Sequence, residues 1–218
     1  HNNLGDAFEE MGLVDEAISE TRKALLIDPD YAVAHYGLGI LYAKKGLIDE
    51  AIDEYREALK IKPDFVQVRN NLGLIYRERG SLDKAIVEYK EALRIKPYLP
   101  EIYDNLGVAY MEKGLLDEAI FEFKKALGID PDYTNVHYNI GGAYAYKGLF
   151  NKAVESYKRV LEIDPDDKEA LFSLGLIYSK IGMIDQAVAQ YKAALRVDPG
   201  FQEVREELKK IRFSPQNR

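Results

Sequence analysis

Apolar residues recur along the chain at intervals of three and four positions, which places them on one side of an α-helix. Residues 100–133 show this pattern twice. The first stripe is formed by Tyr103, Leu106, Gly107 and Tyr110, and the second by Ala119, Ile120, Phe123, Ala126 and Leu127. The pattern predicts two amphipathic helices joined by a short turn at Gly114.

The same pattern returns every 34 residues and is marked by columns of one residue type. The two glycine columns are Gly5, Gly39, Gly73, Gly107, Gly141 and Gly175, then Gly12, Gly46, Gly80, Gly114, Gly148 and Gly182. The proline column is Pro29, Pro63, Pro97, Pro131, Pro165 and Pro199. Unbroken columns of this kind exclude coincidence, so the chain is a repeat protein with one helix pair in each repeat.

Each predicted helix has residues that begin or end it. Gly114 ends a first helix because glycine tolerates the left-handed conformation that is common at helix C-termini. An acidic column, represented by Asp117, is expected to cap the second helix with a side-chain oxygen. Pro131 then closes the repeat because proline cannot continue a helix. Gly107 and Ala119 are small, so we expect the two helices of a pair to approach closely there.

The order Leu-Gly, aromatic, Gly, Asp-Glu-Ala, aromatic, Ala and Pro within 34 residues resembles the tetratricopeptide repeat. The resemblance covers residues 1–201. It implies an all-α fold, an α-α superhelix in which antiparallel helix pairs form a right-handed solenoid. Departures from the family pattern are Thr21 in an aromatic column, Val160 in an alanine column, and the replacement of the family's tryptophan by His1, His35, Arg69, Tyr103, His137 and Leu171.

The columns divide the chain into six repeats and an end. The repeats are expected at 1–31, 32–65, 66–99, 100–133, 134–167 and 168–201, followed by a capping helix at 202–213 and a tail at 214–218. His1 falls in the column of His35 and His137, so the first repeat is truncated, and we expect a fragment of a longer protein. Lys209 stands in the glycine column of a seventh repeat, where it would block a second helix, and this favours a cap.

Composition narrows the function. The net charge of −7 and the pI near 5.2 argue against a nucleic-acid surface. The chain has no cysteine for thiolate chemistry, and no apolar run reaches the roughly 18 residues of a membrane helix. The three histidines lie in one column of different repeats, which suits packing rather than metal ligation. We expect no cofactor, no metal and no catalysis in these residues. A cytoplasmic location is favoured, although the residues do not fix the compartment.

One side of each first helix is predicted to be exposed. At about 100° per residue, positions 101, 104, 105, 108, 111 and 112 lie opposite the core positions of their helix. Within the family resemblance, this side lines a concave groove that holds extended peptides or partner helices. One of its columns consists of Asn3, Gly37, Asn71, Asn105, Asn139 and Ser173.

Four asparagines in that column require a reason, because asparagine is a poor helix former. An asparagine amide both donates and accepts hydrogen bonds, so a row of them can grip the backbone of an extended ligand. Similar ladders occur in the tetratricopeptide superhelices of the O-linked N-acetylglucosamine transferases and of kinesin light chains. Alternatively, each amide bonds to a neighbouring helix and stabilises the superhelix. The residues leave both readings open.

Apolar and acidic side chains complete the predicted groove. They are Tyr36, Ile40, Leu74, Val108, Met111, Tyr138, Tyr146, Phe172 and Leu176, with Glu101, Asp104 and Glu112 among the acids. Contiguous exposed apolar surface is typical of a binding site, but packing between adjacent helices would also account for some of these residues. The acids favour a neutral or basic protein or peptide partner. The basic clamp by which some family members hold the carboxylate end of chaperones is absent.

Three functions are consistent with this pattern. The first is a scaffold or adaptor that binds a peptide or partner segment in its groove. The second is the substrate-recognition arm of a larger enzyme, such as a glycosyltransferase, whose catalytic part lies outside these residues. The third is a structural protein that assembles with copies of itself.

Overall fold

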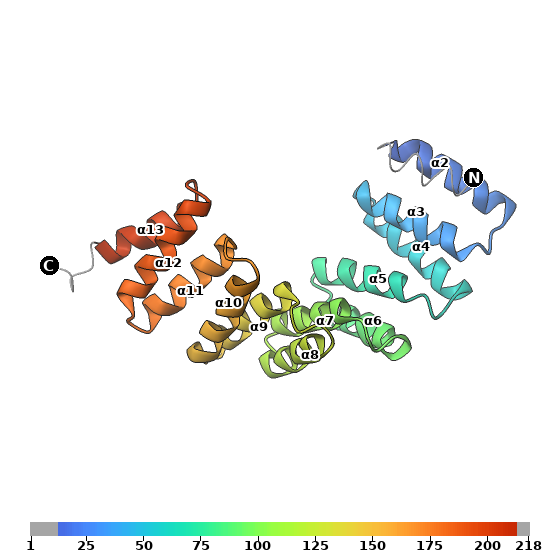
Figure 1. Cartoon of the computed structure of the whole chain (residues 1–218). Helices are drawn as coiled ribbons and strands as arrows, with labels where there is room; N and C mark the ends of the chain where they lie inside the picture. Colours follow the sequence, from blue (N-terminus) through green and yellow to red (C-terminus); the bar gives the residue numbers. More distant parts are fainter. Residues whose placement is uncertain (1–12, 213–218) are drawn as a thin grey trace. The chain divides into compact units, whose positions relative to one another are not determined.

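The computed structural model describes residues 13–212, and within this range the chain forms twelve α-helices and no β-strand (Figure 1). The helices are α2 (Val14–Ile27), α3 (Ala32–Lys44), α4 (Ile48–Ile61), α5 (Val66–Glu78), α6 (Leu82–Ile95), α7 (Pro100–Glu112), α8 (Leu116–Ile129), α9 (Thr134–Tyr146), α10 (Phe150–Ile163), α11 (Lys168–Lys180), α12 (Ile184–Val197) and α13 (Gln202–Arg212). The predicted all-α fold is confirmed. The first helix of repeat one, including Asn3, and the tail lie outside the described residues.

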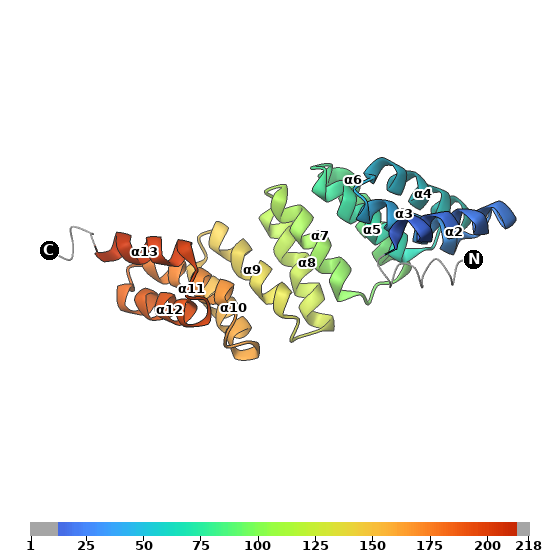
Figure 2. The ribbon, with the colours of Figure 1, turned by 90° about the horizontal axis from the view of Figure 1, so that it is seen from above.

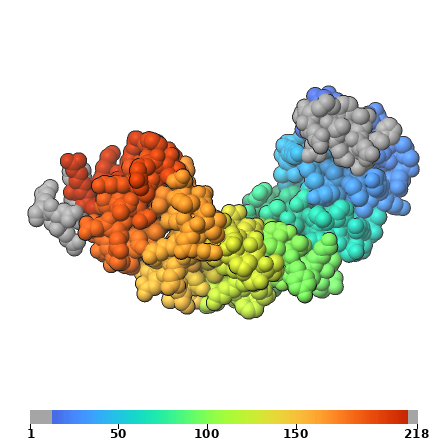
Figure 3. Space-filling view, viewed as in Figure 1, coloured from blue at the N-terminus to red at the C-terminus, as the bar shows by residue number. Residues whose placement is uncertain are grey.

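Each complete repeat pairs a first helix of 13 residues with a second helix of 14 residues, for example α3 with α4 and α11 with α12. The chain divides into two compact units, residues 1–109 and residues 110–218. Within the units, the paired helices α3 and α4, α5 and α6, α9 and α10, and α11 and α12 lie side by side (Figure 2). Within each unit, consecutive repeats lie next to one another in chain order (Figure 3). The core is therefore built between neighbouring helices, as in other repeat proteins.

A tyrosine ring of the second helix packs against a glycine of the first helix in several pairs. Gly39 of α3 faces Tyr55 of α4, and a Cβ atom added to this glycine would lie 2.5 Å from the tyrosine Cδ1. The same pairing joins Gly73 to Tyr89, Gly141 to Tyr157 and Gly175 to Tyr191. The glycine column thus provides room for a buried aromatic ring of the paired helix, in these pairs a tyrosine rather than the alanine expected from the sequence.

The turn inside each complete repeat ends at a glycine in the left-handed conformation. Gly114 has φ +78° and Gly148 has φ +73°. After Gly148, the amide N–H of Leu149 donates to the carbonyl of Tyr144 at 2.9 Å and closes the turn. The predicted role of this glycine column is confirmed, because residues with a Cβ rarely adopt this conformation.

The acidic column does not cap the second helices. A capping side chain stands immediately before the first helical residue, but α8 is preceded by Leu115, so Asp117 already lies inside the helix. The prediction is therefore wrong for this column. Asp15, Asp49 and Asp117 of this column instead form ion pairs with a basic residue of the next repeat. Arg79 Nη1 lies 2.6 Å from Asp49 Oδ1 and holds the pKa of that carboxyl below its usual range.

Helix α13 packs on α12 at the C-terminal end of the described residues. Val204 is fully buried and Leu208 is half-buried, whereas Lys209 and Arg212 are exposed. One side of α13 is therefore apolar and covered, and the other faces solvent. This is the arrangement expected of a capping helix.

Candidate peptide-binding face

Each of the first helices α3, α5, α7, α9 and α11 has a partly exposed side that carries predicted site residues. These sides, taken helix by helix within each unit, are here called the first-helix face. Glu101 and Glu112 are exposed on it. The partly exposed apolar residues are Tyr36, Ile40, Leu74, Val108, Met111, Tyr138 and Phe172, while Leu176 and Tyr146 are exposed. Asp104 differs from the prediction, because only 9% of it is exposed. It stands in the column of Tyr36 and Phe172, whose rings pack onto neighbouring elements rather than pointing into solvent.

Two asparagines of the predicted ladder donate hydrogen bonds to neighbouring helices. Asn71 Nδ2 donates to the phenolic oxygen of Tyr55 at 3.2 Å, and Asn105 Nδ2 donates to Asn70 Oδ1 at 3.0 Å. Asn139 is half-buried in α9. Each amide nitrogen carries a second N–H and each amide has an oxygen, so these contacts leave groups that a ligand can use.

Aromatic residues of the first-helix face also pack inside their repeats. The ring of Tyr36 lies 5.0 Å from that of Phe65 and 6.0 Å from that of Tyr55, between ring centroids. The rings of Tyr138 and Tyr157 meet edge to face at 5.5 Å. Separations of this size are typical of favourable aromatic pairs. These aromatic residues therefore hold helices together and present only part of their surface to solvent.

Buried phenols lie beneath this face. Burial raises the pKa of both Tyr55 and Tyr157 to about 12, an effect that the hydrogen bond from Asn71 opposes in Tyr55. Both side chains are consequently neutral at physiological pH. They act there as hydrogen-bonding groups and not as acids or bases.

A pocket in the first unit brings three predicted site residues together. It has a volume of about 260 Å³ and lies between α3, α5 and the start of α7. Tyr36, Asn71 and Glu101 line it, and Asn70 and Lys96 are among their neighbours. An aromatic ring, an amide and a carboxylate thus converge on one depression. Ile40 and Leu74 do not line it.

A second pocket, in the other unit, has a volume of about 370 Å³ and lies between α9 and α11, over α10. Tyr146 and Leu176 line it, as expected for groove residues. Gly142, Phe150 and Tyr157 also line it and were missed by sequence reasoning. The available signal was Gly142, which occupies a column that otherwise holds large apolar residues in the complete repeats.

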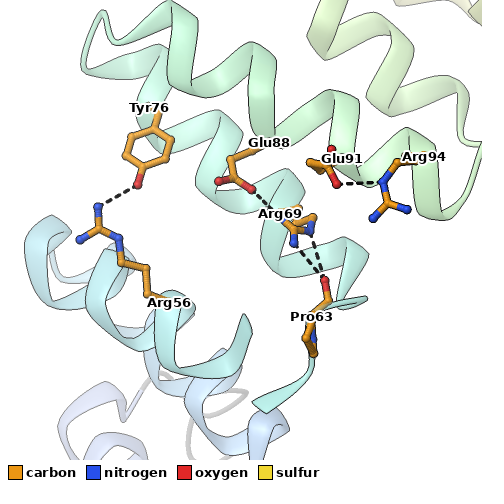
Figure 4. Close-up of polar contacts among 7 residues, drawn as sticks. All are labelled: Arg56, Pro63, Arg69, Tyr76, Glu88, Glu91 and Arg94. Atoms are coloured by element: carbon orange, nitrogen blue, oxygen red, sulfur yellow. Dashed lines mark hydrogen bonds and ion pairs between the residues drawn. The ribbon is translucent and has the colours of Figure 1, made fainter. Parts of the chain in front are cut away.

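Side chains in the column where the family has tryptophan form hydrogen bonds with the turn between repeats. Arg69 donates through Nη2 to the carbonyl of Pro63 at 3.0 Å and through Nη1 to Glu88 at 2.9 Å (Figure 4). His35 makes equivalent contacts, with Nε2 3.0 Å from the Pro29 carbonyl. His137 Nε2 likewise lies 2.8 Å from the Pro131 carbonyl, so His35 and His137 have a structural role. No three potential metal ligands gather anywhere in residues 13–212.

Two family models match this chain. A family model described as "TPR repeat" matches residues 5–46, 41–76, 73–114, 109–148 and 141–182, and one described as "Tetratricopeptide repeat" matches residues 168–201. The chain belongs to the tetratricopeptide repeat family. A comparison with curated proteins found no match.

Several solved structures share this fold. MamA is 30% identical, with a TM-score of 0.71 over 76% of this chain and 97% of MamA. PilF of Pseudomonas aeruginosa is 23% identical, with a TM-score of 0.80 over 95% of each chain. YrrB, described as a TPR protein with an unusual peptide-binding site, is 18% identical, with a TM-score of 0.71 over 87% of this chain and 97% of YrrB. Within residues 13–212, no helix is both long and apolar enough to cross a membrane.

Proposed function

We propose that this tetratricopeptide chain is a non-catalytic scaffold whose first-helix face binds an extended peptide or partner segment. The observation that carries the proposal is the pocket lined by Tyr36, Asn71 and Glu101. It combines apolar area with an amide and a charge, the combination that is typical of ligand sites. Family membership adds support, because repeat arrays of this kind present extended binding surfaces.

The chemistry of the face indicates what it binds. Asn71 and Asn105 keep amide groups that can bond to the backbone of an extended chain without reading its side chains. Glu101 and Glu112 are exposed and favour a neutral or basic partner. Tyr36 offers part of a ring for apolar contact. The ligand that fits is therefore an extended segment with few acidic residues along these helices.

The test begins with selection of a binding peptide from a phage-displayed random library. The variant Asn71→Ala, Asn105→Ala and Asn139→Ala should bind that peptide about tenfold to a thousandfold more weakly, since each lost set of hydrogen bonds costs roughly 0.5 to 1.5 kcal/mol. Tyr55→Phe is the matched control. It removes the contact of Asn71 with the scaffold but leaves the asparagine, so affinity should be retained.

A second control lies on the second helices. Val87 of α6 and Phe121 of α8 are large, apolar and exposed, and neither belongs to the first-helix face. Replacing both with serine should leave the affinity unchanged. Loss of binding in that variant, with full binding in the asparagine variant, would place the ligand on the second helices and refute the proposal.

A further inference from the structure

The pocket between α9 and α11 lies where a glycine replaces a large apolar residue. Gly142 occupies the column of Ile40, Leu74, Val108 and Leu176. Ala145 lies in a column that holds Arg77 and Met111 but also the small Ala43 and Ser179, and Ser173 lies in the column of Asn71, Asn105 and Asn139, which also holds Gly37. Gly142 is therefore the substitution that sets this pocket apart. A Cβ atom added to Gly142 would meet only the Tyr157 hydroxyl, at 3.7 Å. The missing side chain has therefore left open space that nothing from this unit refills.

The walls of this pocket are mainly apolar and aromatic. Tyr157 is buried at its base, Phe150 and Ile177 contribute apolar surface, and Leu176 stands on the α11 side. Tyr146 borders the pocket and keeps 78% of its surface exposed. The volume of about 370 Å³ is near the lower end of the range for ligand pockets, roughly 300 to 1,000 Å³. It suits one large side chain better than a whole cofactor.

A single cation borders the pocket. Lys180 Nζ lies 5.3 Å from the centroid of the Phe150 ring. None of the residues that line the pocket is acidic, and Lys180 is the one cation among them. The complementary ligand therefore carries a carboxylate beside its apolar group. This differs from the first unit, where Glu101 lines the pocket.

We propose that this pocket is an anchor site for one large apolar side chain of a partner peptide, with the carboxylate of an adjacent residue on the ammonium group of Lys180. The anchor rests on the proposed function, because it lies on the same first-helix face. It adds a specificity that the asparagines cannot supply, since amides bond to any backbone whereas the pocket selects a side chain. A peptide fits this site better than an isolated small molecule does. The exposed Tyr146 and the half-buried Ser173 border the pocket, and a peptide chain can continue along them.

The test uses three synthetic dodecapeptides made of glycine and serine. The first carries a central phenylalanine followed by glutamate, the second has serine in place of the phenylalanine, and the third has lysine in place of the glutamate. Titration into the ¹⁵N-labelled protein should shift the amide signals of Gly142, Ser173 and Leu176 with the first peptide. The second peptide should bind about tenfold to a hundredfold more weakly, which is what burial of one large apolar side chain is worth. Equal binding of the first two peptides would overturn the proposal.

Two variants locate the site. Gly142→Leu restores the residue found at positions 74 and 176, and it should fill the pocket while keeping the fold, because leucine is the better helix former. This variant should bind the phenylalanine peptide only as weakly as it binds the serine peptide. Lys180→Glu should lower the affinity for the glutamate peptide roughly twofold to fivefold and raise the affinity for the lysine peptide. Unchanged binding in Gly142→Leu, with native circular dichroism, would refute the anchor site.

The library-selected peptide separates this inference from the proposed function. Suppose that the asparagine variant binds the selected peptide more weakly, whereas Gly142→Leu binds it with the affinity of the parent. The first-helix face then binds peptides, and the anchor site is refuted. Suppose instead that the phenylalanine peptide binds at Gly142, whereas the asparagine variant binds the selected peptide as tightly as the parent. The anchor site is then supported, and the asparagines are not part of the peptide site.

Discussion

Asn71 Nδ2 lies 3.2 Å from the phenolic oxygen of Tyr55, whereas the buried hydroxyl of Tyr191 has no hydrogen-bond partner among residues 13–212. The two tyrosines occupy the same column. Tyr55→Phe should therefore lower the free energy of unfolding by roughly 0.5 to 1.5 kcal/mol, the net value of one hydrogen bond. Tyr191→Phe should leave it unchanged or raise it, because an unpaired buried hydroxyl is unfavourable. Urea denaturation of both variants checks this, and an equal loss in the two would contradict it.

Two glycines of α3 provide a matched pair for the packing of the repeat. Gly39 faces the Tyr55 ring, whereas a Cβ at Gly37 would meet no atom within 4 Å. Gly39→Ala should destabilise the protein by roughly 1 to 3 kcal/mol through overpacking. Gly37→Ala should stabilise it by about 0.5 to 1 kcal/mol through helix propensity. Thermal unfolding of the two variants should shift in opposite directions, and a shared direction would argue against ring packing as the reason for the glycine column.

Low pH should lower the stability of the C-terminal repeat, because it protonates Asp198. Lys168 Nζ lies 2.7 Å from one oxygen of this carboxylate and the Gly200 N–H lies 2.8 Å from the other, and together they hold the pKa of Asp198 below its usual range. A carboxyl with a lowered folded pKa stabilises the protein above its unfolded pKa of about 3.9, and this contribution is lost as the pH falls through the folded pKa.

The measurement is thermal unfolding from about pH 6 to about pH 2, a range that includes the unfolded pKa of the carboxyl. Asp198→Asn should show a shallower fall in melting temperature over the acid part of this range. A slope identical to that of the parent would show that the Lys168 contact contributes nothing to stability.

Helix α13 should keep the end of the array monomeric. Removing residues 202–218 would uncover Tyr191 and Leu195 of α12, the helix on which the buried Val204 packs. Exposed apolar area of this kind promotes association. Light scattering over a concentration series should show oligomers of the truncated chain, with a truncation at residue 212 as the monomeric control. A monomeric and equally stable chain lacking 202–218 would rule out the capping role.

The sequence by itself determined the helices and their pairing. Helix ends are set locally: Gly114 adopts the left-handed conformation that closes a turn, and Pro131 follows the second helix of its repeat. The period of 34 then repeats the same pair, so the all-α fold could be predicted from the spacing, and the family from the residue types that recur at that spacing. The N-terminus of α8 could not, because Leu115 and Asp117 lie two residues apart and only backbone geometry decides which of them stands before the helix.

The site depended on tertiary structure. The sequence placed Asn71 and Asp104 on one exposed side of their helices, but whether each meets solvent or protein depends on the helix packed beside it. The structure gives Asn71 a contact with Tyr55 and leaves Asp104 almost covered. Gly142 is the clearest case. The sequence shows only that a glycine stands where other repeats have a large side chain. Whether a pocket results depends on Phe150 and Tyr157 of α10 and Leu176 of α11, which surround this position only in the folded chain.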